Sequence, residues 1–340
     1  MSLSTADWNT CRTLLCGLEE TIRDAVVGVR LRDGADGFSV IAEVSEADTI
    51  YAVDKISEEA IFSWFSKSWP AEWPIRVIME GIDDHTTVVF PEGAKPMLVC
   101  ILDPIDGTRN IMYDKRSAWI IGGLGPIPAD RPPRLRDLEV AAMTELPVLK
   151  QTIGDQISGV RGCGPEGLFR ERINLISGER KRFTCRPSAA KNLKHGFSSL
   201  VKFFPDGKEL VGKLEESLWK EVFVDEPPGS PMVFDDQYIS TAGQFYEIFV
   251  GHDRFIADLR PLVSKKLGLT NALVCHPYDV AAMLLLEESG ALLEDAYGHP
   301  LDGPLDTVSP IAWVGFSNAL IADQIRPILH RLRDQYLAQD

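Results

Sequence analysis

The hydrophobic positions at the start of the chain recur at the spacing of an α-helix. Trp8, Leu15, Leu18, Ile22 and Val26 fall on one face, with polar residues between them. Apolar residues three, four or seven positions apart line one side of a helix and pack against a core. The pattern therefore predicts an amphipathic N-terminal helix.

A short β-type run over residues 38–44 follows, and a second helix is predicted to begin near Asp54. Pro70 and Pro74 end this helix, because proline has no amide hydrogen and its ring collides with the preceding turn. Beyond them the pattern changes from a helical period to short apolar runs.

Three of these runs indicate strands, at residues 76–79, 97–102 and 119–124. Continuous apolar runs of this length are typical of strands buried on both faces. Residues 138–183 carry further short runs separated by glycines, a pattern that indicates a meander of short strands. The first half of the chain is thus predicted to be rich in strands.

A polar stretch at residues 184–194 marks a domain boundary, and we predict domains at residues 1–188 and 189–340. The second half is predicted to contain strands at 197–204, 291–293 and 313–316, and helices at 208–220, 244–250, 279–288 and 319–336. The chain therefore mixes helices and strands in both halves.

Composition narrows the classes of function. The 340 residues are 45% hydrophobic, which is typical of a folded globular protein. The formal net charge is −15, and no basic run is present, so we expect no nucleic-acid partner. A small anionic substrate would need cations, bound to acidic side chains, to reverse the local sign of the charge.

The six cysteines, at positions 11, 16, 100, 163, 185 and 275, form no C-x-x-C pair. We expect reduced, mostly buried thiols in a cytoplasmic protein. The N-terminus has no signal-peptide pattern, and no apolar run is long enough to span a bilayer. We therefore expect no membrane partner.

Acidic residues stand at the edges of three predicted elements. Glu80 directly follows one apolar strand, Asp279 begins a helix, and a second strand is followed by Asp103-Pro104-Ile105-Asp106-Gly107-Thr108. A turn through Ile105 can bring Asp106 back beside Asp103, and two close carboxylates repel each other unless cations lie between them. Hard divalent cations, Mg²⁺ above all, prefer such all-oxygen sites.

Each of these acids also has an ordinary structural explanation. Taken alone, Glu80 is a solvated loop acid and Asp279 is a helix N-cap. Asp54 is an acid at a helix start, and the Asp-Gly-Thr segment that ends at Thr108 is a common turn. The prediction of a metal site therefore depends on the combination of these residues.

The combination resembles the inositol monophosphatase and fructose-1,6-bisphosphatase superfamily of Mg²⁺-dependent, Li⁺-sensitive phosphatases. The run from Asp103 to Thr108 is similar to the first signature of that family. The second signature, W-D-x-A-A and then E-A-G-G, is similar to Tyr278-Asp279-Val280-Ala281-Ala282 with Glu287-Glu288-Ser289-Gly290. Tyr278 replaces the common Trp. Both signatures occur in the family's order, and a looser resemblance extends over most of the chain.

The resemblance implies a layered α-β-α-β-α fold of mixed α+β or α/β class, with two sheets and with helices between and outside them. It places an antiparallel sheet and the metal site in residues 1–188, and the substrate pocket in residues 189–340. It implies hydrolysis of a small phosphate monoester, an inositol phosphate or a sugar phosphate, by a water that is activated by two or three Mg²⁺ ions. Mn²⁺ can substitute, the partner is a small phosphorylated substrate, and a homodimer is possible.

The resemblance also implies roles for individual residues. The metal ligands are oxygen atoms of Glu80, Asp103, Ile105, Asp106 and Asp279. The attacking water is activated by Thr108 with Asp54 or Glu80. The substrate is held by Asp106, Gly107, Thr108, Thr241, Ala242 and Asp279, where Ser240-Thr241-Ala242 is similar to the family's Gly-Thr-Ala segment.

Departures from the family bear on the substrate. Gly81 stands where the family usually has a second Glu, and Ala272 stands where the inositol-specific enzymes carry Glu. The segment before Asp279 is longer than in those enzymes, and it contains Arg254, Arg260, Lys265 and Lys266. Of these, Arg260, Lys265 and Lys266 either lie on a solvated helix face, or at least one of them holds a second anionic group of the substrate.

Three alternatives therefore stay open. The chain is also compatible with a sugar bisphosphatase similar to fructose-1,6-bisphosphatase, or with a 3′-nucleotide bisphosphatase. From a different class, it is compatible with a non-catalytic protein that binds metal or phosphate.

Overall fold

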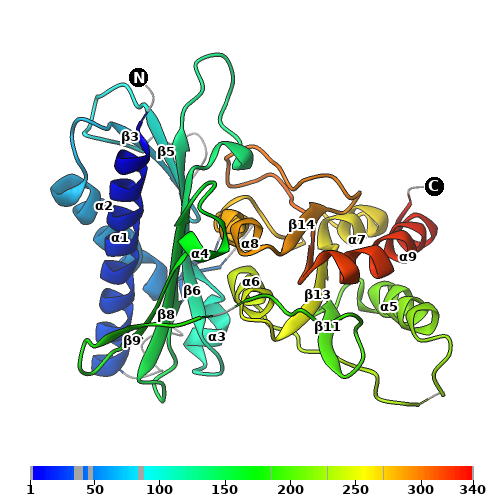
Figure 1. Ribbon diagram of the computed structural model, residues 1–340. Helices are drawn as coiled ribbons and strands as arrows, with labels where there is room; N and C mark the ends of the chain where they lie inside the picture. Colours follow the sequence, from blue (N-terminus) through cyan, green and yellow to red (C-terminus); the bar gives the residue numbers. More distant parts are fainter. Residues whose placement is uncertain are drawn as a thin grey trace.

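The computed structural model in Figure 1 describes residues 3–33, 41–44, 49–82, 88–184, 186–227, 229–270 and 272–338. Side chains are described within these ranges except at residues 33, 41–44 and 49–56. Five layers follow one another across the view: a helical layer, a large sheet, a central helical layer, a smaller sheet and an outer helical layer. The predicted α-β-α-β-α arrangement is confirmed.

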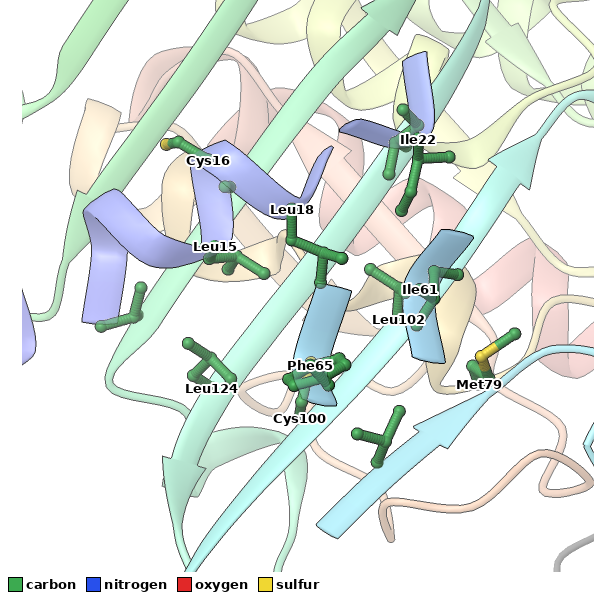
Figure 2. Close-up of a cluster of buried hydrophobic side chains, with 14 of the residues drawn as sticks. Leu15, Cys16, Leu18, Ile22, Ile61, Phe65, Met79, Cys100, Leu102 and Leu124 are labelled. Carbon is green, nitrogen blue, oxygen red and sulfur yellow. The ribbon is translucent and has the colours of Figure 1, made fainter. Parts of the chain in front are cut away.

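The first layer consists of two long helices, α1 (Thr5–Asp33) and α2 (Ala52–Ser68). The apolar residues that predicted the first helix are all buried. Figure 2 shows Leu15 and Leu18 of α1 and Phe65 of α2 gathered over Leu102 and Leu124 of the large sheet. The helical period of the sequence therefore corresponds to one core between the helices and the sheet.

The described part of the predicted strand at residues 38–44 is β1 (Ile41–Val44), which pairs with β2 (Thr49–Tyr51) as a separate two-stranded sheet. Residues 38–40 lie outside the described residues.

The large sheet has the strand order β10-β9-β8-β7-β6-β5-β3-β4. Its strands are β3 (Ile75–Met79), β4 (Val88–Phe90), β5 (Leu98–Asp106), β6 (Ala118–Pro126), β7 (Val140–Leu146), β8 (Ile153–Val160), β9 (Phe169–Asn174) and β10 (Arg180–Arg182). Strands β5 to β10 pair antiparallel in sequence order, which confirms the predicted meander. The sheet departs from the expected antiparallel pairing at one place. Because β4 occupies the edge beside β3, β5 lies on the other side of β3 and runs parallel to it.

The smaller sheet has the order β12-β11-β13-β15-β14. Its strands are β11 (Gly196–Leu200), β12 (Val233–Phe234), β13 (Asp253–Asp258), β14 (Leu292–Asp295) and β15 (Trp313–Phe316). The predicted boundary at residues 184–194 falls between β10 and β11. Strand β11 is shorter than predicted, since it ends at Leu200. Strand β13 was not predicted, because charged residues flank the apolar stretch 255–257 on both sides.

Two helices, α6 (Thr241–Phe249) and α8 (Met283–Ser289), lie between the sheets and contact both. Three helices cover the far face of the smaller sheet: α5 (Lys208–Val222), α7 (Arg260–Leu267) and α9 (Ala319–Leu337). The shorter helical elements are α3 (Thr108–Met112), α4 (Gly164–Gly167), and the 3₁₀ turns η2 (Leu135–Asp137) and η3 (Tyr278–Val280). The single helix predicted over residues 279–288 is wrong, because Asp279 lies in η3 and α8 begins four residues later.

A glycine in β6 explains how η3 packs on the large sheet. A Cβ atom at Gly123 would lie 2.8 Å from the carbonyl oxygen of Ala281 and 2.7 Å from the side chain of Leu138. Contacts this short are not tolerated by a real side chain. The missing side chain therefore lets the segment that carries Asp279 approach the sheet.

We expect Gly123→Ala to lower the free energy of unfolding by about 1–3 kcal/mol, the usual cost of overpacking a core. Gly212→Ala is the control, because a Cβ at Gly212 in α5 meets nothing within 4 Å. It should stabilise the protein by up to about 1 kcal/mol, since alanine favours a helix over glycine. Urea unfolding followed by circular dichroism measures both. A stabilising effect of Gly123→Ala would show that the close approach is absent.

The five described cysteines are free, and Cys11, Cys16, Cys100 and Cys275 are buried, as expected for reduced thiols. Cys185 lies outside the described residues. Among the described helices, none combines the length and the apolarity that crossing a membrane requires.

Candidate metal centre

Asp103 and Asp106 reach the same side of β5 because the strand has an extra residue between them. In a regular strand, residues three apart point to opposite faces. Here Asp103 lies opposite Ile121 and Asp106 lies opposite Trp119 of β6, so three steps on β5 match two steps on β6. Trp119 and Ile121 share one face and pack in the same core cluster. This β-bulge therefore brings the two carboxylates together.

The bulge is held by a local turn. The N–H of Ile105 donates a 2.9 Å hydrogen bond to Oδ1 of Asp103, which confirms the turn predicted through Ile105. Gly107 follows with φ of 95°, a left-handed conformation that favours glycine, and α3 begins at Thr108. A Cβ at Gly107 would lie 3.1 Å from the carbonyl oxygen of Ile239, so glycine also allows the close approach of the segment before α6.

Glu80 lies beside Asp103 because β3 and β5 run parallel. Met79 is opposite Leu102 in the register of these strands, so the next residue of each strand continues at the same edge of the sheet. The N–H of Glu80 donates a 3.3 Å hydrogen bond to the carbonyl oxygen of Leu102. The charge of the Glu80 carboxylate contributes to raising the pKa of Asp103.

Asp279 comes from the central layer, where η3 packs against β5, β6 and α6. Its Oδ2 atom accepts a 2.6 Å hydrogen bond from the N–H of His276. One carboxylate oxygen from each of Asp103, Asp106 and Asp279 lies within 4.8 Å of the others. No other group of three His, Cys, Asp or Glu side chains is gathered so closely in the described part of the chain.

Asp106 is oriented by the beginning of α6. Its Oδ2 atom accepts hydrogen bonds from the hydroxyl of Ser240, at 2.9 Å, and from the N–H of Ala242, at 2.5 Å. Burial raises the pKa of Asp106 to about 6, and these two hydrogen bonds limit the rise. The resemblance placed Ser240 in the segment similar to Gly-Thr-Ala, but it implied no contact between Ser240 and Asp106. The signal was its position before an apolar helix, where serine is a preferred N-cap.

The electrostatics of the three acids fit a divalent cation. Loss of hydration raises the pKa of Asp103 well above its usual range, and the charges of Glu80, Asp106 and Asp279 raise it further. Loss of hydration and then the charge of Asp106 act in the same direction on Asp279. Close, poorly hydrated carboxylates favour either protons or a cation between them. Hard oxygen donors are the ligands that Mg²⁺ prefers, so the residues fit that ion.

Thr108 and Thr241 lie at the centre. The hydroxyl of Thr108 donates a 2.9 Å hydrogen bond to the carbonyl oxygen of Ile105. The hydroxyl of Thr241 is directed at Sγ of Cys275, 4.0 Å away. The backbone of Thr241 contributes a hydrogen bond that limits the rise in the pKa of Asp106, so Thr241 borders the centre through its backbone. Asp54 lies in the first turn of α2, and its side chain is outside the described part of the structure.

The structure separates the basic residues that the sequence grouped together. The side chain of Arg260 is 15% exposed, and its charge counteracts the rise in the pKa of Asp106 and of Asp279. Arg254 lies at the opposite end of β13, where it donates to the backbone carbonyls of Asn192 and Lys194.

Comparison with known proteins agrees with this architecture. No protein-family model matches the chain, and no curated protein sequence matches it. Inositol monophosphatase from Anabaena is similar in structure, with a TM-score of 0.58, 14% identity and 98% of each chain covered. Fructose-1,6-bisphosphatase from Leishmania major in its holo form has a TM-score of 0.60 and 15% identity, over 95% of this chain and 92% of that one.

The extragenic suppressor protein SuhB from Bartonella henselae has a TM-score of 0.59 and 16% identity, over 95% of this chain and 98% of that one. At such identities the likeness shows the fold. It confirms that this chain has the architecture that the two signatures implied.

Proposed function

We propose, from the fold shared with these structures and from the acids at its centre, that this protein is a Mg²⁺-dependent phosphomonoesterase acting on a small substrate. The observation that supports the proposal is the gathering of Asp103, Asp106 and Asp279 within 4.8 Å at the end of β5. A purely structural role would not favour three acids of raised pKa in one poorly hydrated place, because their mutual repulsion opposes folding.

The ions would be held by five oxygen donors, from Glu80, Asp103, Ile105, Asp106 and Asp279, with Mn²⁺ as a substitute for Mg²⁺. When bound, they supply positive charge to the phosphoryl oxygens and lower the pKa of a water molecule. This charge also explains how a chain with a net charge of −15 accepts an anionic substrate.

Thr108 would position the attacking water. Its hydroxyl hydrogen is donated to the carbonyl oxygen of Ile105, which has no hydrogen to give back. The lone pairs of the Thr108 oxygen are therefore the part left to accept a hydrogen bond from water. Glu80 or Asp54 would receive the proton, and the water would attack phosphorus in line with the leaving alcohol. Gly107, Thr241 and Ala242 would border the phosphoryl group.

Release of inorganic phosphate from a panel of phosphate monoesters tests the proposal. We expect turnover with Mg²⁺ or Mn²⁺, complete loss in excess chelator, and recovery when Mg²⁺ is added back, because an all-oxygen site has no strong affinity for softer metals. Undiminished turnover in excess chelator would contradict metal dependence. Binding of Mg²⁺ without hydrolysis of any ester would favour a non-catalytic metal-binding protein instead.

A further inference from the structure

A pocket of about 170 Å³ opens in the half of the chain that supplies Asp279. It lies at the carboxyl ends of the parallel strands β11 and β13, where sheets of this kind usually bind ligands. Its apolar wall is formed by Val201, Phe204, Val211, Val263, Leu269 and Leu273. Arg260 also lines the pocket, as do Ala272 and Leu273. The chain leads from Leu273 through Cys275, which contacts Thr241, to Asp279, so one segment joins the pocket to the three carboxylates.

Three of the five N–H groups of the Arg260 guanidinium are already used within the protein. Its Nε and Nη2 atoms donate to the carboxylate of Asp258, at 2.9 and 2.6 Å, and Nη1 donates to the carbonyl oxygen of Leu273, at 3.3 Å. The Asp258 carboxylate is fully buried, so this ion pair is poorly hydrated and neutral as a unit. Lys265 and Lys266 do not line the pocket.

The other charges in the wall are also balanced. The ammonium group of Lys202 is bound by the carboxylates of Glu215 and Asp235. Asp206 and Lys208 add one charge of each sign. The pocket therefore has no excess of positive charge that would favour a bisphosphorylated substrate.

The apolar part of this wall, with Ser264 and Ala272, would match a polyol poorly. The hydroxyl of Ser264 already donates to the carbonyl oxygen of Leu269, and Ala272 offers no hydrogen-bonding group. Each hydroxyl buried without a partner weakens binding, because its hydrogen bonds to water are lost and not replaced.

The size and lining of the pocket are those of a site for one ring. An apolar cavity of about 150 Å³ lined by Leu, Ile and Phe binds benzene. Here Arg260 and Phe204 both line the pocket, and the guanidinium carbon of Arg260 lies 5.7 Å from the ring centre of Phe204, so a planar cation and an aromatic ring meet at the wall. An aromatic ring of a ligand can stack on the guanidinium plane or pack against the phenylalanine ring.

Building on the phosphatase activity proposed above, we propose that this pocket binds an uncharged aromatic ring of the leaving alcohol. The preferred substrate is then the phosphate monoester of an alcohol that carries one such ring. In the reaction, the bond from the water oxygen to phosphorus forms, the bond from phosphorus to the ester oxygen breaks, and the alcohol leaves with a proton that originates from the water.

Steady-state kinetics with matched esters tests this assignment. We expect kcat/KM for 2-phenylethyl phosphate to exceed that for ethyl phosphate, myo-inositol 1-phosphate and fructose 1,6-bisphosphate by about 10-fold or more, the usual gain from one apolar group in a fitting pocket. A preference for the inositol ester or for the bisphosphate would overturn the proposal.

Ala272→Phe fills the pocket, and Ala71→Phe is its matched control at an exposed position after α2. Ala272→Phe should lower kcat/KM for 2-phenylethyl phosphate by about 10-fold or more and should change that for ethyl phosphate by less than about threefold. Turnover of ethyl phosphate shows that the variant is folded. Equal losses on both esters would overturn the proposal, and Ala71→Phe should alter neither.

Binding of 2-phenylethanol to the metal-free protein, measured by saturation-transfer NMR, tests the pocket without turnover. We expect a signal that Ala272→Phe abolishes, and no signal from myo-inositol. If no ester is hydrolysed, the phosphatase proposal fails while this measurement still decides the pocket: binding that Ala272→Phe removes supports it, and absence of binding overturns it.

Discussion

Asp103→Asn is expected to lower the rate of phosphate release by about 10³-fold or more. Asp279→Asn should lower this rate by a similar factor. Metal ions contribute several kcal/mol to stabilising the transition state, and about 1.36 kcal/mol corresponds to a tenfold change in rate. Asparagine keeps an oxygen that can accept the hydrogen bond from the N–H of Ile105, so the turn should persist. Initial rates of phosphate release with saturating Mg²⁺ measure the effect.

The matched control is Asp130→Asn, which removes an exposed carboxylate and should leave turnover unchanged. Near-normal activity of Asp103→Asn would show that the metal centre has been misassigned. Loss of activity together with loss of the native circular dichroism spectrum would instead indicate a structural role.

Thermal unfolding of the metal-free protein provides an independent readout for the same variant. The pKa of Asp103 is raised by burial and by the charges of Glu80, Asp106 and Asp279. An acid whose pKa is higher in the folded than in the unfolded protein destabilises the fold when it is ionised. Its contribution to stability is therefore most favourable at low pH, and this contribution is lost as the pH rises through the folded pKa. Asp103→Asn should therefore raise the Tm at pH 8, and the difference from the unmodified protein should shrink towards pH 4.

Thr108→Ala is expected to lower kcat by about 10²–10⁴-fold, the usual size for losing a positioned proton-transfer group. Thr108 contacts the carbonyl of Ile105 through its hydroxyl, and it contributes no carboxylate to the acidic cluster. Affinity for Mg²⁺ should therefore change little. Single-turnover kinetics and calorimetric titration with Mg²⁺ measure the two quantities separately.

Thr108→Ser is the conservative partner of this variant, because serine retains the hydroxyl at the same position. It should recover most of the activity that Thr108→Ala loses. If serine is as inactive as alanine, the methyl group rather than the hydroxyl matters. If calorimetry shows that Thr108→Ala abolishes Mg²⁺ binding, the loss of rate would reflect loss of the metal.

Local patterns predicted the elements whose apolar residues are periodic or continuous. The face formed by Leu15, Leu18 and Ile22 became the buried side of α1, because a long helix against a sheet must bury one stripe. The apolar run before Asp103 became a central strand, because a continuous apolar run is typical of a strand that is buried on both faces. In contrast, the ends of β13 carry Asp253 and Asp258, so a local reading finds no run there, although parallel pairing with β11 defines the strand.

The break before α8 was equally hidden from local reading. Residues 279–288 have a good helical pattern, but Ala281, directly after η3, packs closely against Gly123 of β6, and this packing favours a 3₁₀ turn at Asp279 instead. This contact joins residues far apart in the chain, and no propensity of the segment itself reports it.

The sequence by itself determined the local chemistry: two acids, a proline and a Gly-Thr pair that turn the chain at the end of a buried strand. The resemblance implied Glu80 and Asp279 as further members, and only the tertiary structure decided how these two acids and Ser240 meet the turn. The parallel register of β3 and β5 places Glu80 at the same edge, the start of α6 directs Ser240 at Asp106, and η3 supplies Asp279. The physical reason is that strand register, a bulge and the approach of one layer to another depend on pairing between distant segments, whereas a turn depends on neighbouring residues.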